Sequence, residues 1–168
     1  MRLFIAIQVS ETVRKSLLLM QENMRAKGVR GTYTKPENLH LTLAFIGEYG
    51  DPDSVLDVME AVPFEPFRIG LDGFGHFGDL WWAGLSGSTE LAAYVRRLRR
   101  ALSEGDIPFD RKKFSPHMTL VRRAVFETKE MPGLYVPKTE MTVRYISLMR
   151  SDRGRNGMIY TELGRVPF

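Results

Sequence analysis

The sequence contains no cysteine, and its longest apolar runs are short. The missing thiols exclude a disulfide scaffold, a thiolate zinc site and a cysteine nucleophile. The apolar stretch at residues 2–7 ends before it reaches the length of a signal-peptide core, and no window approaches a membrane span. We therefore expect a soluble, cytoplasmic protein that does not enter a membrane.

Histidine is scarce as well, with three in the chain, and a phosphate-binding P-loop is missing. Residues 74–78 (FGHFG) are rich in glycine but lack the P-loop pattern, and we expect their histidine, His76, to be structural. The motifs that contain the other two histidines include no carboxylate, so they do not complete a metal site. We expect no metal and no other cofactor.

Length and composition are those of an ordinary globular protein. The 168 residues are 43% hydrophobic and 26% charged, which predicts a single domain spanning residues 1–168 with a sizeable core, and two small lobes built as one compact unit fit this length as well. The net charge of +4 favours an anionic partner, such as nucleic acid or a phosphorylated small molecule. A solvated surface that happens to be basic explains the same charge equally well.

Hydrophobic periodicity predicts strands and helices in a mixed order. Ser10 and Asp51 are candidate helix N-caps, and Gly28 is a candidate stop. Helices are expected at residues 11–27, 53–61 and 89–104, and strands at residues 2–9, 30–34, 39–46, 67–77, 80–85, 117–123, 140–150 and 158–166. This mixture of hairpins and helices predicts an α+β fold with antiparallel sheets.

The helix at residues 89–104 combines an apolar stripe with a strongly basic remainder. Leu91, Val95, Leu98 and Leu102 share one face, while arginines at positions 96, 97, 99 and 100 cover much of the rest. This pattern is typical of a nucleic-acid-binding helix, although a solvated basic face is the more frequent explanation.

Two of the three histidines stand in the same local frame. His40 and His117 are each followed by an apolar residue, a threonine and a leucine, and they lie 77 positions apart (117 minus 40). Side chains two residues apart point to the same face of a strand, so each histidine should project beside Thr42 or Thr119. A spacing close to half of the chain suggests two similar halves that each contribute one His/Thr pair to a shared cleft.

This pair of motifs suits the cleavage of a phosphodiester without a metal. One imidazole can act as base while the other acts as acid, and the two hydroxyls can donate to phosphate oxygens. A cation just beyond the second motif, Arg122 or Arg123, can stabilise the negative charge of the transition state.

At these residues the chain resembles a known family. Residues 38–47 (NLHLTLAFIG) and 115–122 (SPHMTLVR) resemble the twin His-x-Thr-x signatures of the two-histidine phosphoesterases. The closest branch is that of the bacterial and archaeal RNA 2',3'-cyclic phosphodiesterases, also called 2'-5' RNA ligases, whose usual start is similar to residues 2–7 (RLFIAI). The resemblance implies a bilobal α+β fold with pseudo-twofold symmetry, in which two antiparallel sheets flank a central groove and helices pack outside.

The resemblance also implies a reaction and a role for each residue. The family hydrolyses a terminal 2',3'-cyclic phosphate on RNA to a 2'-phosphate. His40 would protonate the leaving 3'-oxygen, His117 would accept a proton from water, and Thr42 and Thr119 would bind the phosphate. Arg122 matches the arginine that follows the family's second motif.

The sequence leaves the arginine open. Strict alternation along the strand places Arg123 on the face of His117 and Thr119, so Arg122 reaches the site only through a bulge or the end of the strand. The symmetry of the motifs likewise leaves the two histidines interchangeable as acid and base on physical grounds.

Three alternative functions share these residues. The same groups could join a cyclic phosphate end to a 5'-hydroxyl, which is ATP-independent 2'-5' ligation. The substrate could instead be a small cyclic nucleotide. The chain could also be a non-catalytic RNA-binding module that uses helix 89–104 and the basic loop at residues 111–113. Because one chain carries both motifs, we expect a monomer.

Overall fold

The computed structural model describes residues 1–86, 89–127 and 130–167. The helices are α1 (Glu11–Ala26), α2 (Pro52–Ala61) and α3 (Thr89–Glu104), with a short 3-10 turn η1 (Pro36–Asn38). The strands are β1 (Arg2–Gln8), β2 (Arg30–Tyr33), β3 (His40–Glu48), β4 (Phe67–Phe77), β5 (Leu80–Ser86), β6 (Met118–Val125), β7 (Glu140–Val143), β8 (Ile146–Gly154) and β9 (Gly157–Val166).

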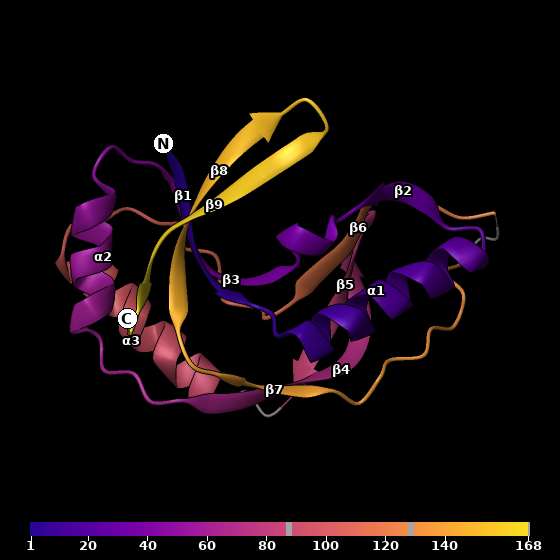
Figure 1. Cartoon of the computed structure of the whole chain (residues 1–168), viewed down its shortest axis with the longest axis horizontal. Coiled ribbons are helices and arrows are strands. Elements are labelled where there is room, and N and C mark those ends of the chain that lie inside the picture. The colour runs from indigo at the N-terminus through magenta and orange to yellow at the C-terminus, as the bar shows by residue number, and fades with distance from the viewer. Residues whose placement is uncertain (87–88, 128–129, 168) are drawn as a thin grey trace.

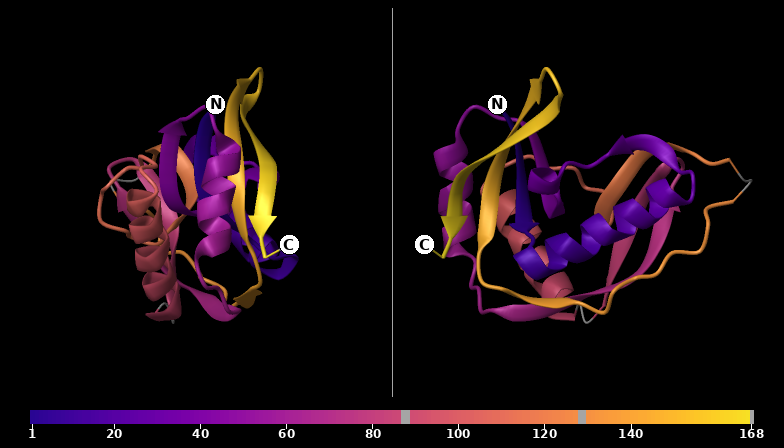
Figure 2. Two further views of the ribbon diagram at one scale, coloured as in Figure 1. Left: turned by 90° about the vertical axis from the view of Figure 1, so that its left-hand side faces the viewer. Right: turned by 45° about the vertical axis from the view of Figure 1, so that its right-hand side comes forward.

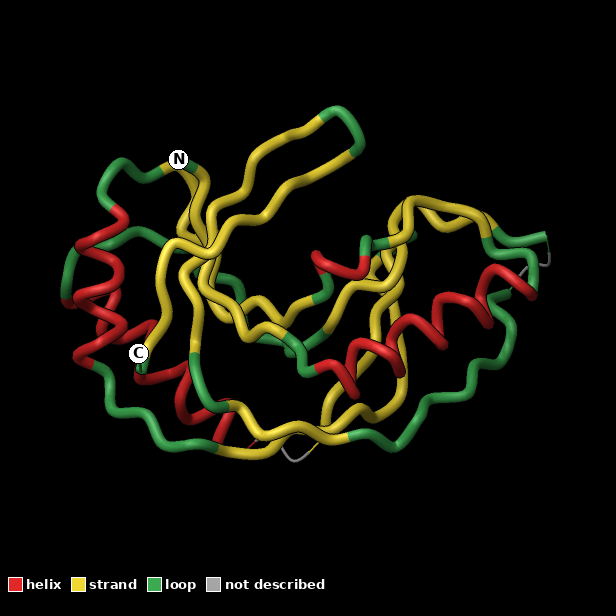
Figure 3. The backbone as a smooth tube through the Cα atoms, in the orientation of Figure 1, coloured by secondary structure: helices red, strands yellow, loops and turns green. Residues whose placement is uncertain are grey.

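The strands form two antiparallel sheets, which confirms the predicted α+β class. A four-stranded sheet has the order β3-β1-β8-β9, and a five-stranded sheet has the order β2-β6-β5-β4-β7. We call the first sheet with α2 and α3 the first lobe, and the second sheet with α1 the second lobe; they lie to the left and right in Figure 1. Figure 2 shows α2 and α3 side by side on the flank of the first lobe. In Figure 3 the hairpin of β8 and β9 extends beyond the rest of its sheet.

The two lobes do not coincide with the two halves of the sequence. The first sheet combines β1 and β3 from the start of the chain with β8 and β9 from its end. The second sheet contains β2, from the early part of the chain, which pairs with β6 at the edge of the sheet. The half-chain spacing of the motifs therefore reflects the symmetry of the site, whereas the chain itself passes repeatedly between the lobes.

One predicted strand is divided between the lobes. The sequence predicts a continuous strand over residues 140–150, but β7 pairs with β4 in the second sheet and β8 pairs with β1 in the first. The apolar pattern runs through the break because Val143 and Ile146, on either side of it, are both buried. A pattern of burial does not reveal which sheet a strand joins.

The local signals at the helix ends are confirmed. The Ser10 hydroxyl accepts a hydrogen bond of 3.2 Å from the Val13 amide, and the Asp51 carboxylate accepts one of 3.2 Å from the Ser54 amide. Gly28 follows α1 with a φ of 83°, a left-handed conformation that glycine adopts without strain.

One continuous core joins both sheets and all three of these helices. The predicted apolar stripe of α3 is fully buried in it, beside residues of β1, β3, β6 and β8. Because the same core runs beneath both sheets, the lobes are fixed relative to one another by packing as well as by the chain. None of the helices in the described residues is long and apolar enough to span a bilayer.

Candidate functional site

The two motifs meet where the lobes join. His40 is the first residue of β3, and His117 immediately precedes β6. Strands β3 and β6 contact each other although they belong to different sheets. The buried leucines of each motif enter the core, so His40 and Thr42 face away from it, as does Thr119.

Both imidazoles are held in the same way. The Nδ1 atom of His40 lies 2.6 Å from the carbonyl oxygen of Asn38, and that of His117 lies 2.7 Å from the carbonyl oxygen of Ser115. A carbonyl only accepts, so Nδ1 carries a proton in each ring and Nε2 is the atom that can gain or lose one. In the free protein the Nε2 atom of His40 lies 2.8 Å from the Thr42 hydroxyl oxygen.

Aromatic rings flank each imidazole and fix its plane. Phe4 and Tyr160 lie 5.1 and 5.3 Å from the ring of His40, measured between centroids. Phe77 and Trp82 lie 5.1 and 6.1 Å from the ring of His117. The two His-x-Thr motifs do not identify these four aromatic residues. Their only signal in the sequence is that they stand in strands whose side chains alternate between two faces.

Gly75 makes room for one of these rings. A Cβ atom at this position would lie 2.4 Å from the indole of Trp82, which therefore rests directly on the backbone of β4. A side chain larger than hydrogen at position 75 would displace Trp82 from His117.

A bulge in β6 decides which arginine lies on the face of Thr119, the face that is expected to line the groove. Thr119 pairs with Trp82 and Val121 pairs with Trp81, so Leu120 is an extra residue on β6. Adjacent tryptophans face opposite sides of β5, hence Thr119 and the buried Val121 also face opposite sides. Arg122, the next residue, therefore lies on the face of Thr119.

Strand β3 has the equivalent bulge at the equivalent position. Thr42 pairs with Ala6 and Ala44 pairs with Ile5, which leaves Leu43 as the extra residue. Both bulges thus fall on the third residue after the histidine. Beyond each bulge, the next residue on the face of the threonine is Phe45 on β3 and Arg122 on β6. The side chain of Phe45 is 52% exposed.

The two arginines at the end of the second motif now differ in position. Both arginines are exposed, but the charge of Arg122 acts on His40, whereas Arg123 follows in a left-handed conformation with a φ of 55°. Strict alternation, which would place Arg123 on the site face, is wrong here because the bulge shifts the phase of the strand by one residue.

The environment of His40 favours the neutral form of its imidazole in the free protein. Burial lowers the pKa of the His40 imidazole, and the positive charges of Arg122 and His117 lower it further. The hydrogen bond to the Asn38 carbonyl acts in the opposite direction and raises this pKa. Arg122 and His117 belong to the second lobe, so charges from across the junction of the lobes act on His40.

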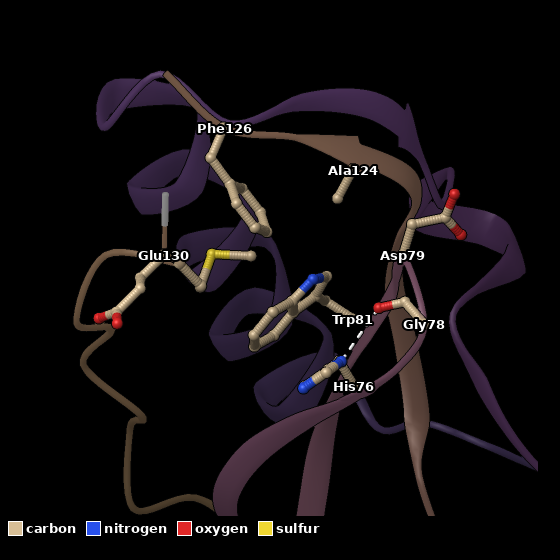
Figure 4. A pocket seen from close by; sticks show the side chains of 8 residues that line it. His76, Gly78, Asp79, Trp81, Ala124, Phe126 and Glu130 are labelled. Atoms are coloured by element: carbon tan, nitrogen blue, oxygen red, sulfur yellow. Dashed lines mark hydrogen bonds between the residues drawn. The ribbon is translucent and has the colours of Figure 1, made fainter. Parts of the chain in front are cut away.

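His76 lies apart from this site, on the other face of the β4–β5 hairpin. Its ring stacks on Trp81 at 4.4 Å and its Nδ1 atom lies 3.0 Å from the Gly78 carbonyl oxygen. Both residues line a cavity of about 360 Å³ together with Phe126 and Met131 (Figure 4). Within the described ranges, no group of three His, Asp or Glu side chains lies together as a metal site would require.

The basic helix is not uniformly solvated. Arg99 of α3 points inward, where its guanidinium donates to the Leu43 and Lys112 carbonyl oxygens. Burial lowers the pKa of the Arg99 guanidinium, and the charge of Asp110 works against this. Arg99 is therefore a structural residue, and the remaining arginines of α3 form the solvated basic face.

Comparisons with known proteins identify the family of the chain. Residues 21–155 match the family model of the 2'-5' RNA ligase superfamily. An RNA 2',3'-cyclic phosphodiesterase of Thermotoga maritima is 30% identical over 100% of this chain and 96% of its own length. The protein of the same name from Thermus thermophilus is 34% identical over 97% of this chain and 88% of its own.

Solved structures show the same fold. The protein TT0787 of Thermus thermophilus superposes with a TM-score of 0.83 at 31% identity, covering 98% of this chain and 96% of its own. The apo form of E. coli LigT superposes with a TM-score of 0.81 at 25% identity, covering 98% and 95% of the two chains. On this evidence of sequence and fold, the chain belongs to the 2'-5' RNA ligase superfamily.

Proposed function

We propose that this protein hydrolyses the 2',3'-cyclic phosphate at the end of an RNA to a 2'-phosphate, without a metal ion. The observation that carries the proposal is the twin arrangement of His40 and His117. Each ring is fixed through Nδ1 and leaves Nε2 for proton transfer. The curated relatives bear the name of this activity, and the net charge of +4 suits an anionic polymer.

The reaction needs one proton acceptor and one proton donor. Nε2 of His117 accepts a proton from water as its oxygen attacks phosphorus. The bond between phosphorus and the 3'-oxygen breaks, and Nε2–H of His40 protonates that oxygen. The products are a 2'-phosphate and a free 3'-hydroxyl, and each imidazole exchanges its proton with solvent before the next turnover.

The remaining groups bind the phosphate. Thr42 and Thr119 donate hydrogen bonds to its non-bridging oxygens, and Arg122 stabilises the charge that develops on them. The exposed ring of Phe45 lies on the same face, beside Phe4, and offers a surface on which the terminal base can stack. Because both motifs belong to one chain, a monomer suffices for this reaction.

Because the pKa of His40 is lowered in the free protein, an anionic substrate that raises it would help to charge the proton donor. A neutral imidazole cannot protonate the 3'-oxygen, but an anionic phosphodiester beside His40 favours the imidazolium and offsets the charge of Arg122. We therefore expect His40 to take up its proton when the substrate binds.

The primary test uses a short RNA with a 2',3'-cyclic phosphate end, incubated in EDTA. We expect a 2'-phosphate product, and we expect His40→Ala and His117→Ala to lower kcat by at least about 10²-fold each. Activity that disappears in EDTA would contradict the metal-free reaction, and full activity in both variants would contradict the assignment of the histidines. RNA binding that survives in both variants, with no turnover by the wild type, would instead indicate a binding module.

A second test separates the acid from the base. A substrate whose 3'-oxygen is replaced by sulfur releases a thiolate, which needs little protonation. The variant of the proton donor should therefore regain activity on this substrate, while the variant of the base should not. Rescue of His117→Ala rather than His40→Ala would reverse the two roles.

Ligation is the second candidate, since the matching family model carries that name. A 5'-hydroxyl that replaces water at the same phosphorus gives a 2'-5' linkage through the same atoms. The ratio of hydrolysed to joined product, measured with an RNA that presents both ends, decides between them.

A further inference from the structure

In each bulge the carbonyl oxygen of the extra residue accepts a hydrogen bond from a side chain of a packed helix. On β6 this is the oxygen of Leu120, the extra residue. The backbone amide of Thr34 donates to it at 3.0 Å, and the side-chain amide of Gln21 in α1 donates to it at 3.0 Å and to the Thr34 oxygen at 2.9 Å. Gln21 therefore ties the end of β2 to the bulge in β6. Gln21 is 1% exposed, so these hydrogen bonds lie inside the core, where an unpaired polar group lowers the stability of the fold.

The first lobe repeats this device. The extra residue of β3 is Leu43, and its carbonyl oxygen accepts hydrogen bonds of 3.2 and 3.0 Å from Nε and Nη2 of Arg99 in α3. The donors differ in chemistry and come from different helices. Both nevertheless contact the residue that lies three positions after the histidine of the motif.

The bulge fixes the phase of the strand beyond it. With Leu120 as an extra residue, Arg122 faces the groove and Arg123 does not. Without the extra residue, alternation would continue and the two arginines would exchange faces. A side chain that stabilises the bulge therefore determines which of the two arginines contacts the phosphate.

We propose that Gln21 is a positioning residue, which holds the bulge at Leu120 so that Arg122 faces the phosphate. Arg99 has the same role in the first lobe, where it holds the bulge at Leu43 so that Phe45 lies on the face of Thr42. Gln21 lies in α1 and acts on the reaction only through the backbone of β6. This inference rests on the proposed function, because Arg122 has a task only where a phosphate is bound.

The test replaces Gln21 by leucine, which has a similar size but no donor. We expect Gln21→Leu to lower kcat on the cyclic phosphate RNA about tenfold, because Arg122 then contacts the phosphate in only part of the molecules. The matched control is Met20→Ala, a neighbour in α1 that is also fully buried but has no side-chain donor for either carbonyl. It destabilises the same helix through a cavity and should leave kcat within about twofold of the wild type.

A double-mutant cycle separates positioning from general loosening of the fold. In an Arg122→Ala background, Gln21→Leu has no arginine left to displace, so we expect it to change kcat by less than about twofold. A tenfold loss that persists in this background would overturn the proposal. So would an equal loss in Met20→Ala.

The experiment also distinguishes failure of the variant to fold, failure of the proposed function and failure of the positioning role. If Gln21→Leu does not fold, Gln21→Met retains more of the packing, lacks the donor in the same way, and enters the same cycle. If the wild type does not hydrolyse the cyclic phosphate, the proposed function is wrong. If the wild type is active, Arg122→Ala is impaired and Gln21→Leu is not, the positioning role alone is wrong.

Discussion

Arg99 offers the sharpest test of how the bulge in β3 is stabilised. Its guanidinium donates to two carbonyl oxygens, those of Leu43 and Lys112, at distances between 2.7 and 3.2 Å. The same group lies 5.7 Å from the ring centroids of both Phe109 and Phe114. Arg99→Ala removes all of these contacts and leaves the Leu43 carbonyl without its donor.

The cost follows from the number and exposure of these hydrogen bonds. A hydrogen bond to a charged group contributes about 1.5–3 kcal/mol, so two satisfied carbonyls give roughly 3–6 kcal/mol. The contact with Lys112 is exposed and is worth less than the one with Leu43. We therefore expect Arg99→Ala to lower the free energy of unfolding by about 3 kcal/mol. With a urea m-value of about 2 kcal/mol/M, the midpoint falls by about 1.5 M.

The assay is urea unfolding followed by tryptophan fluorescence, with Arg100→Ala as the matched control. Arg100 is the next residue of α3, and its Nε atom forms an exposed ion pair of 3.4 Å with Glu104. Loss of such a surface pair costs about 0.5 kcal/mol or less. If the two variants shift the midpoint equally, Arg99 belongs to the solvated basic face after all and the bulge does not depend on it.

Three further predictions concern titration and helix capping. The imidazole of His40 should titrate below its ordinary pKa in an NMR experiment, because burial and the charge of Arg122 lower it; Arg122→Gln should move the midpoint upward. Burial acts to raise the pKa of the Glu162 carboxyl, but hydrogen bonds from Arg165 and two other side chains outweigh it and lower the pKa. The stability from this carboxylate is present above its unfolded pKa and is lost as pH falls, so Glu162→Gln should lose less stability than the wild type between about pH 6 and pH 3. Asp51→Ala should cost about 1 kcal/mol in urea unfolding, because the amide in the first turn of α2 loses its acceptor.

The sequence identifies the chemistry of the site better than its geometry. The frames around His40 and His117 repeat the same residue types at the same spacing, so they can be recognised without coordinates. Their companions Phe77 and Trp82 become visible only when strand pairing brings them to His117. Their sequence positions alone resemble those of ordinary strand residues.

The elements are predictable from local signals, but their assignment to sheets is not. Alternation and capping residues place the helices close to their observed ends, because these signals act within a few residues. The division of residues 140–150 between β7 and β8 depends on pairing with β4 and β1, which lie far away in the chain. The bulge at Leu120 is hidden for the same reason, since its carbonyl partner Gln21 is separated from it by 99 positions.

The repeated passage of the chain between the lobes has a consequence for how the protein tolerates damage. Neither sheet is encoded by one continuous piece of sequence, so a cut in the middle of the chain divides the strands of both sheets between the two fragments. Half of the chain cannot fold into half of the site, and the gap between the two imidazoles depends on the completeness of the whole molecule. We therefore expect clipped protein to lose activity in a single step rather than through a half-active form.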